Sequence, residues 1–384
     1  MTEGAESIRR ETRPKPIQVS VIVPVYNRSQ ELRRLLSALG RQAAPPVNVE
    51  VLVCDDGSTE DLAPMVDEFN GQGGMRVIHL SQSNQGAGAA RDLGLAHAQG
   101  EIVAFTDSDC EPDPNWLAEL VRPFRDPRVG IVGGLIDYRT AQHLSGRCVN
   151  FLMSSMLGAG GARDPRSAVH MKYYPRAGNL AVRRELAKEV GGFPTSPHGE
   201  DLEFSHKVLQ LGVRVQFAAS AGVVHNERRT WSQVAEEAFW KGIARVRLAR
   251  RHGMHELIHM LPALFCLYLI LFCGIGVVRP DLVPWCAAPA CLYATVLAVL
   301  SWQGMFAIAD VRAGLLVPLY AVTIHLSYGL GYLWAWPQAV LWSPLRNVLQ
   351  KRRKSYHPPA AVDDVKHVHT APPTAAIARK RAHR

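Results

Sequence analysis

Two aspartates separated by one serine are the residues of this 384-residue chain best suited to hold a metal ion. Asp107 and Asp109 follow the apolar run Glu101–Thr106, so both can project to the same side of a strand end. Neighbouring carboxylates repel each other unless a proton or a cation neutralises them. A hard divalent ion, Mg²⁺ or Mn²⁺, takes oxygen ligands and can bridge a diphosphate, so the pair indicates metal-assisted chemistry. The alternative for this pair alone is a solvated acidic turn.

Short apolar runs that end in polar clusters recur along residues 17–220 and alternate with segments of helical periodicity. Such a pattern predicts an α/β fold with a parallel sheet buried on both faces. Ligands of these sheets bind beyond the carboxyl ends of the strands. We expect strands at Val19–Val25, Val49–Cys54, Met75–Leu80, Glu101–Thr106 and Val213–Ala218, and helices at Ser29–Arg41 and Ala87–Ala98.

The second strand runs into an acidic pair, Asp55 and Asp56. Because adjacent strand residues point to opposite faces, only one of the two can enter a site directly. The segment Gly86-Ala87-Gly88 superficially indicates a dinucleotide-binding loop. Arg91 stands where the third glycine would be, and no acidic residue follows to hold a ribose, so we discount that interpretation.

The motifs of roughly residues 17–245 are far more specific in series than singly. They read V-I-V-P-V-Y-N, V-x-D-D-G-S, N-Q-G-x-x-x-A-R-D-x-G, F-T-D-S-D-C-x-P-D-P-x-W-L, A-G-N-L-A-V-R-R-E, G-G-F, G-E-D-L-E-F and H-N-E. This series resembles family 2 of the inverting nucleotide-sugar glycosyltransferases. The resemblance implies the GT-A fold, a Rossmann-like α/β sandwich with a mostly parallel sheet, and it specifies a family rather than a substrate.

The resemblance assigns a base-binding pocket to the ends of the first two strands. It implies that Tyr26 stacks on the nucleotide base, with Pro24 and Asn27 shaping the pocket. It also implies that Asp56 accepts a hydrogen bond from the base imide, which favours a uracil- or thymine-type ring and hence a UDP-sugar.

The resemblance assigns the diphosphate and the metal to later motifs. Arg91 would lie near the diphosphate, beside the turn Asn84-Gln85-Gly86, although a surface arginine is the alternative. Asp109 would bind Mg²⁺ or Mn²⁺ directly, and Asp107 would contact the ribose or the metal. His225 resembles a late histidine that several GT-A enzymes use as a further metal ligand, with a structural histidine as the alternative.

The acceptor side resembles the family's acidic motif at Gly199-Glu200-Asp201. Inverting transfer needs a base for the acceptor hydroxyl, a role that we assign to Asp201. Glu200 would orient the acceptor or the following helix, and helix capping is the alternative for both carboxylates. Asn179 and Trp240 would line the acceptor side. The Gln-x-x-Arg-Trp motif of processive members is missing, which favours the addition of a single sugar.

The C-terminal third predicts an integral membrane protein. Three long runs without clustered charge, Leu257–Val278, Leu282–Trp302 and Ala313–Trp342, match the length of a membrane span. An amphipathic helix expected at Trp231–Arg251 would lie at the interface. Both the basic residues of this helix and Lys351–Lys354 favour the cytoplasmic side, which requires an even number of crossings.

We nevertheless expect three spans, the last of which could also lie along the interface or double back at Pro318 or Pro337. The expected organisation is a flexible N-terminus (1–16), a GT-A domain (17–230), an interfacial helix (231–256), a transmembrane region (257–342) and a disordered basic tail (343–384).

Charge and cysteine content limit the other functional classes. Residues 343–384 carry ten basic and two acidic residues, which is +8 of the formal net charge of +9. The nearly neutral remainder argues against nucleic-acid binding. Seven cysteines without a C-x-x-C pair, and an N-terminus without a signal peptide, favour a catalytic domain in the cytoplasm.

The sequence therefore predicts a membrane-anchored, metal-dependent, inverting glycosyltransferase on the cytoplasmic face of a membrane, such as the bacterial inner membrane. It would transfer one sugar to a lipid-linked or membrane-proximal glycan acceptor. A polyprenyl-phosphate sugar synthase is the nearest enzymatic alternative. A membrane scaffold with a vestigial transferase domain is the non-catalytic alternative, which the four intact aspartates Asp56, Asp107, Asp109 and Asp201 oppose.

Overall fold

A computed structural model describes residues 19–43, 48–137, 143–159, 173–194, 198–225 and 230–341, with side chains up to residue 337. The N-terminal segment 1–16 and the tail 343–384, for which we expect flexibility and disorder, lie outside the described residues. So do Asn226 and Glu227 of the H-N-E motif.

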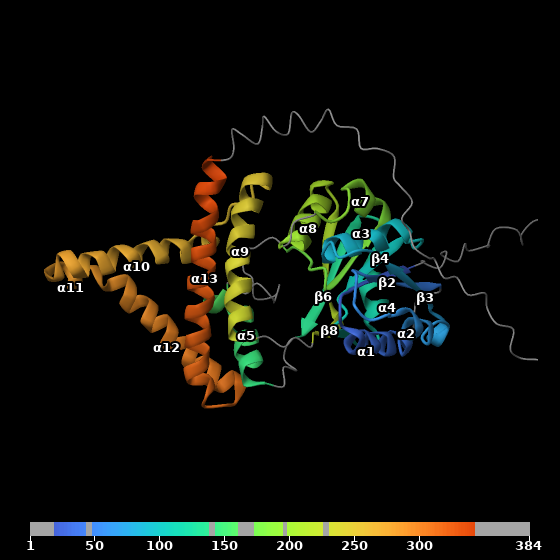
Figure 1. The fold of residues 1–384 in the computed structure, drawn as a ribbon, viewed down its shortest axis with the longest axis horizontal. Helices are drawn as coiled ribbons and strands as arrows, with labels where there is room; N and C mark the ends of the chain where they lie inside the picture. Colours follow the sequence, from blue (N-terminus) through green and yellow to red (C-terminus); the bar gives the residue numbers. More distant parts are fainter. Residues whose placement is uncertain are drawn as a thin grey trace, which may run out of the picture.

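The described residues form one mixed eight-stranded sheet in the order β3-β2-β1-β4-β7-β6-β8-β5 (Figure 1). Four neighbours, β3, β2, β1 and β4, are parallel, whereas β7 runs antiparallel to both β4 and β6. The expected GT-A-type α/β architecture is confirmed. The strands are β1 (Val19–Val25), β2 (Val49–Asp55), β3 (Arg76–Ser81), β4 (Ile102–Thr106), β5 (Cys110–Pro112), β6 (Val129–Asp137), β7 (Asn179–Arg183) and β8 (Arg214–His225).

Helices cover both faces of the sheet, as the continuous apolar strands require. Side chains alternate between the faces, so Val21 and Val23 of β1 pack in one buried cluster and Ile22 packs in the other. The first face is covered by α1 (Ser29–Gly40), α2 (Ala63–Asp67) and α4 (Trp116–Val121), and the second by α3 (Ala87–His97), α7 (Arg184–Glu189) and α8 (Glu200–Gln210).

Pro24 stands inside β1, although proline cannot donate a ladder hydrogen bond. The ladder between β1 and β4 ends at the pair Ile22 and Phe105, two residues before Pro24. The strand therefore loses its neighbour on one side where the proline occurs, and this end of β1 stays open toward the site.

The C-terminal region consists of helices, three of which are long and apolar enough to cross a membrane by length and composition. They are α10 (Leu261–Val278), α12 (Ala288–Ile308) and α13 (Ala313–Leu341), preceded by α9 (Trp231–His252), with α11 (Val283–Cys286) between α10 and α12. The second apolar helix begins six residues after the expected Leu282, because prolines at 280 and 284 form short turns instead. Two further helices, α5 (Leu144–Ser154) and α6 (Met156–Ala159), pack near α12 and α13.

Helix α9 packs closely along α13, between α13 and the catalytic domain (Figure 1). Thr230 and Gln233 form a capping box that fixes the start of α9. Two glycines allow the close approach. A Cβ atom at Gly242 would overlap the carbonyl oxygen of Tyr328, and one at Gly331 would overlap the carbonyl oxygen of Phe239.

Replacing Gly242 by alanine should therefore destabilise the contact between α9 and α13 by about 1–3 kcal/mol. The matched control is Gly274→Ala in α10, where an added Cβ meets no atom within 4 Å. There the change should be neutral or slightly stabilising, because alanine favours a helix over glycine. Thermal unfolding midpoints of the purified full chain in detergent measure both effects. Equal changes of the unfolding midpoint in the two variants would show that α9 and α13 are not in backbone contact at Gly242.

Candidate active site

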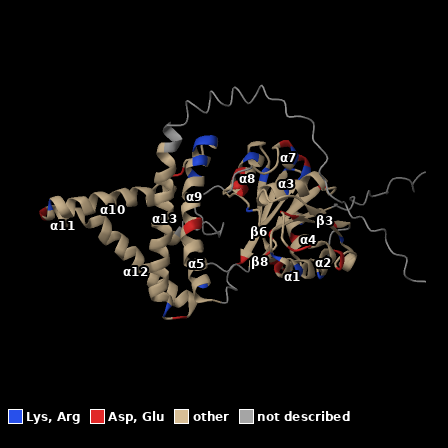
Figure 2. Cartoon of the chain, viewed as in Figure 1, with Lys and Arg blue, Asp and Glu red and all other residues tan. Residues whose placement is uncertain are grey.

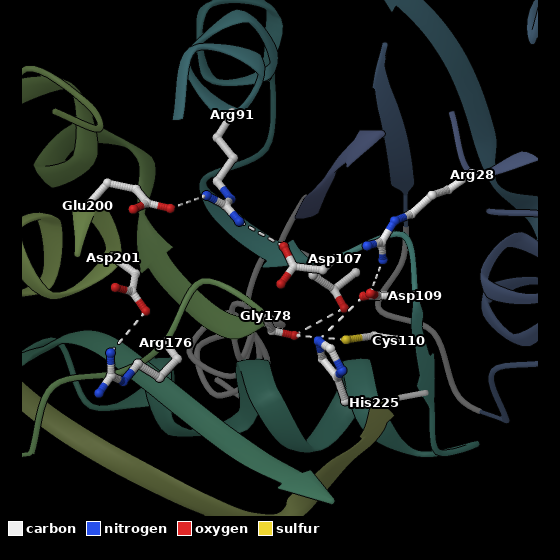
Figure 3. Close-up of polar contacts among 11 residues, drawn as sticks. Arg28, Arg91, Asp107, Asp109, Cys110, Arg176, Gly178, Glu200, Asp201 and His225 are labelled. Carbon is white, nitrogen blue, oxygen red and sulfur yellow. Dashed lines mark hydrogen bonds and ion pairs between the residues drawn. The ribbon is translucent and has the colours of Figure 1, made fainter. Parts of the chain in front are cut away.

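The predicted site residues converge at the carboxyl ends of β1, β2 and β4, together with the start of α8 (Figure 3). This edge is where a parallel α/β sheet presents its ligand site. The residues form four groups, which surround Asp56, Arg91, Asp109 and Asp201.

The Asp56 carboxylate holds the loop that leads into α3. It accepts hydrogen bonds from Gln82 Nε2 at 2.8 Å, from the Gln85 amide at 2.9 Å and from the Gly86 amide at 2.7 Å. Gly86 adopts φ +94°, a conformation that a side chain would strain. A carboxylate has about four acceptor positions, so these three hydrogen bonds leave one of them for a further donor.

Asn27 ties the end of β1 to the loop after β2. Its backbone amide donates to Ser58 Oγ at 2.9 Å, and its Oδ1 accepts from the Thr59 amide at 2.8 Å. Tyr26, the preceding residue, is 47% exposed at the rim, where a ring could stack on a ligand. Asn84 is also exposed, in the loop before α3.

Arg91 is a buried cation that bridges the two halves of the site. Its Nη2 lies 2.7 Å from Asp107 Oδ1 and its Nη1 lies 3.4 Å from Glu200 Oε1, while its guanidinium lies 5.3 Å from the Phe193 ring centre. Arg91 is only 5% exposed, so the surface alternative is wrong. It is held by protein carboxylates rather than directed only toward a diphosphate.

Charge and burial shift the pKa values around Arg91 in opposite directions. Burial alone would raise the pKa of Asp107, but Arg91, with smaller contributions from His225 and Arg28, lowers it. Burial and the neighbouring Asp201 raise the pKa of Glu200, which Arg91 only partly offsets. Asp107 is therefore the ionised partner, whereas Glu200 is the carboxylate that protonates first as the pH falls.

Asp109 and His225 come together across the sheet. The antiparallel pairing of β5 with β8 sets His225 opposite Cys110, and this places His225 Nε2 3.4 Å from Asp109 Oδ1. Arg28, which follows β1, forms an ion pair with the other oxygen of Asp109. Burial and the two nearby aspartates raise the pKa of the Cys110 thiol, which contacts the Gly178 carbonyl at 3.8 Å.

This cluster fits a hard divalent ion. Asp109, Cys110 and His225 offer donor atoms within 4.8 Å of one another, and of these the carboxylate oxygen and the imidazole nitrogen suit Mg²⁺ or Mn²⁺ better than a protonated thiol does. A guanidinium already lies against Asp109, so the position attracts positive charge. Asp107 points toward Arg91 instead (Figure 3), and its role as a metal ligand stays a prediction.

Asp201 is the second residue of α8 and lies on the side of α8 that faces helix α9. Its Oδ2 lies 3.3 Å from Arg176 Nη1, on the segment that precedes β7. Trp240 of α9 stacks on His198 with ring centres 5.3 Å apart, so it borders the same end of α8. The predicted acceptor-side tryptophan is thus near the predicted base.

Asn179 does not point toward an acceptor. Its side chain is 1% exposed and is fully engaged, because it accepts from Trp116 Nε1 at 2.8 Å and donates to the carbonyls of Leu135 and Ala221. The amide therefore joins β7 to neighbouring strands, which is a structural role. Sequence reasoning missed Arg28 as the partner of Asp109, although it directly follows the V-Y-N motif, and it gave Arg176 no individual role.

Comparisons with known proteins agree with this geometry. Residues 20–178 match the model for glycosyl transferase family 2, and residues 102–337 match that for glycosyl transferase family group 2. Glycosyltransferase AglE of Haloferax volcanii is 27% identical over 233 residues, which cover 60% of this chain and 73% of AglE. The pre-mycofactocin glycosyltransferase of Mycobacterium tuberculosis is 33% identical over 246 residues, which cover 62% of this chain and about half (49%) of that relative.

One solved structure has a similar fold over most of the chain. The mannosyltransferase PcManGT from Pyrobaculum calidifontis, in complex with GDP-Man and Mn²⁺, gives a TM-score of 0.53 at 22% identity. The match covers 84% of this chain and 88% of PcManGT. At this identity the likeness concerns the fold.

Removing the central cation should destabilise the catalytic domain strongly. We expect Arg91→Met to cost about 3–5 kcal/mol, because it leaves two carboxylates near each other without their counter-charge. The thermal midpoint should fall by roughly 10 °C. Arg33→Met is the matched control, since Arg33 forms an exposed ion pair with Glu68 and its loss should have no measurable effect. Equal midpoints for the two variants would contradict the bridging role of Arg91.

The raised pKa of Glu200 predicts a pH-dependent cost of keeping this group ionised. Stability of the wild type should fall as the pH rises from about 4.3, the unfolded value, through the raised folded value. Glu200→Gln should flatten this part of the profile of midpoint against pH. Glu185→Gln, an exposed glutamate in the first turn of α7, is the control and should leave the profile unchanged. If the Glu200→Gln variant keeps the wild-type slope of midpoint against pH, the raised pKa does not belong to Glu200.

Proposed function

Since this chain belongs to glycosyltransferase family 2, we propose that it transfers a single sugar, with inversion, from a UDP-sugar to a lipid-linked or membrane-proximal glycan. The chain is a glycosyltransferase of the nucleotide-sugar type with a GT-A fold. The donor base, the acceptor and the residue roles are the proposal. The observation that carries it is the placement of Arg91, which interacts electrostatically with Asp107 on the donor side and with Glu200 and Asp201 on the acceptor side.

The donor nucleotide would occupy the rim between Tyr26 and the Asp56 loop. Tyr26 offers an exposed ring for stacking, and Asp56 keeps one acceptor position for a ring imide N–H. Uracil carries an imide N–H that could donate to this position, as the ring N1–H of guanine could, and the family motif at Asp56 is our reason for choosing a UDP-sugar. PcManGT was solved with GDP-Man, so the base must be tested directly.

Asp109 and His225 would hold Mg²⁺ or Mn²⁺, with Asp107 close by. Such an ion stabilises the negative charge of the departing nucleoside diphosphate. Arg28 contributes a positive charge at the same place, because its guanidinium pairs with Asp109 while its side chain is half exposed.

Asp201 would take the proton of the acceptor hydroxyl onto a carboxylate oxygen as that hydroxyl attacks the sugar. Arg176 holds Oδ2 of Asp201 from the acceptor side, and Arg91 separates Asp201 from the donor-side aspartates. Glu200 is fixed by Arg91 and positions the first turn of α8. Trp240 and His198 form a stacked aromatic pair beside this turn.

A screen of UDP- and GDP-sugars, with and without Mn²⁺, tests the proposal on the purified full chain in detergent. Nucleotide release is read with and without a bacterial membrane lipid extract as the source of acceptor. We expect nucleotide release from a UDP-sugar. The rate of release should fall by about 10²–10⁴-fold in Asp201→Asn, which should still bind the donor. Asp109→Asn should lose metal-dependent donor binding. The exposed Asp67→Asn is the control for loss of an aspartate.

The outcomes separate the alternatives. An Asp201→Asn variant that keeps most of its turnover would indicate a phosphate acceptor, which needs no strong base, and so a polyprenyl-phosphate sugar synthase. Lack of metal-dependent binding of every donor by the wild type would favour the non-catalytic scaffold. Release from GDP-sugars alone would overturn the UDP assignment.

A further inference from the structure

Helix α13 is apolar enough to cross a membrane, but α9 accompanies it for most of its length (Figure 1). Trp231 at the start of α9 stacks on Tyr320 with ring centres 4.3 Å apart. Further along, Gly242 lies against the backbone of Tyr328 and Tyr332, and Val246 packs in one cluster with Tyr332. The two helices therefore run side by side in the same direction from residue 231 to residue 246, which is about 24 Å of helix.

Helix α9 is too polar to lie in hydrocarbon. It carries an exposed Glu236, the ion pair between Glu237 and Lys241, and Arg245 and Arg247 (Figure 2). Each charge at the centre of a bilayer costs about 2.5–3.5 kcal/mol even on the mildest scale. For these five side chains the total cost is comparable with the whole stability of an ordinary domain.

The other side of α9 is attached to the catalytic domain. His252 Nε2 lies 2.9 Å from Glu203 Oε1 of α8, Arg247 donates to the His198 carbonyl, and Leu248 packs on Leu202. A membrane that enclosed α13 would therefore have to enclose α9 and reach the catalytic domain as well. The packing of α13, rather than its composition, therefore argues against a crossing by this helix.

Helices α10 and α12 have no polar helix along most of their length, although α5 packs on the C-terminal half of α12, and both leave α13 in a different direction (Figure 1). They touch α13 at two separate places: Gly304 near the end of α12 meets Val317 in the first turns of α13, and Pro262 at the start of α10 meets Gly329 near the middle of α13. They converge at α11, away from the catalytic domain. At 18 and 21 residues they are about 27 and 32 Å long, which matches a hydrocarbon core of about 30 Å.

Charged residues mark the ends of this hairpin and not its middle (Figure 2). Arg279 and Asp281 form an exposed ion pair at the tip, between α10 and α11. Asp310 and Arg312 form another pair where α12 ends and α13 begins. This distribution is that of two spanning helices with water at the tip and at the base.

The face of α13 that α9 does not cover is suited to the surface of a membrane. Leu315, Leu319, Leu330 and Trp334 are exposed, and their spacing of 4, 11 and 4 residues places them on one stripe. Trp336 is exposed nearby, and tryptophan is enriched at the boundary between headgroups and hydrocarbon. An apolar stripe opposite a polar partner is typical of a helix that lies in the interface plane.

We propose that α13 lies along the membrane surface with its leucine and tryptophan stripe in the lipid, and that, of the described helices, α10 and α12 alone cross the bilayer. The number of crossings is then two rather than the three expected from composition. Two crossings return the chain to the side of the catalytic domain. The basic residues of α9 and Lys351–Lys354 of the tail then share one side, as the distribution of positive charge requires.

Depth measurements on spin labels in proteoliposomes test this arrangement without any need for activity. Cys273, Cys286 and Cys291 are replaced by alanine, since the other four cysteines are buried. Single labels are then placed at Leu315→Cys, Leu319→Cys and Leu330→Cys on α13. We expect equal, shallow depths for all three. Labels at Leu264→Cys, Ile270→Cys and Val277→Cys on α10 are the control and should pass from shallow through deep to shallow.

Depths at 319 and 330 that match the deep value at 270 would overturn the proposal.

A second measurement covers the case in which labels disturb α13. Sealed vesicles carrying Lys188→Cys in the catalytic domain, Asp281→Cys at the hairpin tip or Lys354→Cys in the tail are treated with an impermeant maleimide. The cysteines at 188 and 354 should react from one side and the cysteine at 281 from the other. Reaction of 188 and 354 from opposite sides would establish an odd number of crossings.

Discussion

The site depends on one buried positive charge that is shared by carboxylates from distant parts of the chain. Arg91 lies between Asp107 at the end of β4 and Glu200 at the start of α8. Without that charge, burial and mutual repulsion would force protons onto these groups or push α8 away from the sheet. The same interaction that stabilises the domain therefore also sets the distance between the donor side and the acceptor side.

A second constraint is the attachment of the catalytic domain to the helices that follow it. Helix α9 contacts the start of α8 on one side and α13 on the other, so the proposed base Asp201 lies one helix away from the surface proposed to meet lipid. This arrangement suits an acceptor whose reactive group is held at the height of the headgroups. Chemistry and anchoring are thus joined through packed helices, of which α9 contacts both α8 and α13 and α5 contacts both α12 and α13.

The motifs predicted the sheet and most residues of the site because they occur at strand ends, and strand ends of a parallel sheet meet at one edge. Asp56, Asp107 and Asp109 follow strand ends at this edge, and the start of α8 brings Asp201 to it. The prediction for Asn179 is not supported, since a buried amide that joins strands and an amide that lines a pocket look alike in sequence. The partnership of Arg28 with Asp109 was not predicted, because no local pattern says which carboxylate a loop arginine reaches.

The sequence alone determined the family, the alternation of strands and helices, and the apolar character of α10, α12 and α13, because these follow from local order and composition. The tertiary structure decided which charges neutralise one another, that His225 joins Asp109 through the pairing of β8 with β5, and that α9 accompanies α13. The physical reason is that ion pairing and burial depend on distances between residues that are remote in the chain. A hydropathy pattern shows that a helix is compatible with hydrocarbon. Whether hydrocarbon or protein surrounds the helix depends on the elements that pack against it.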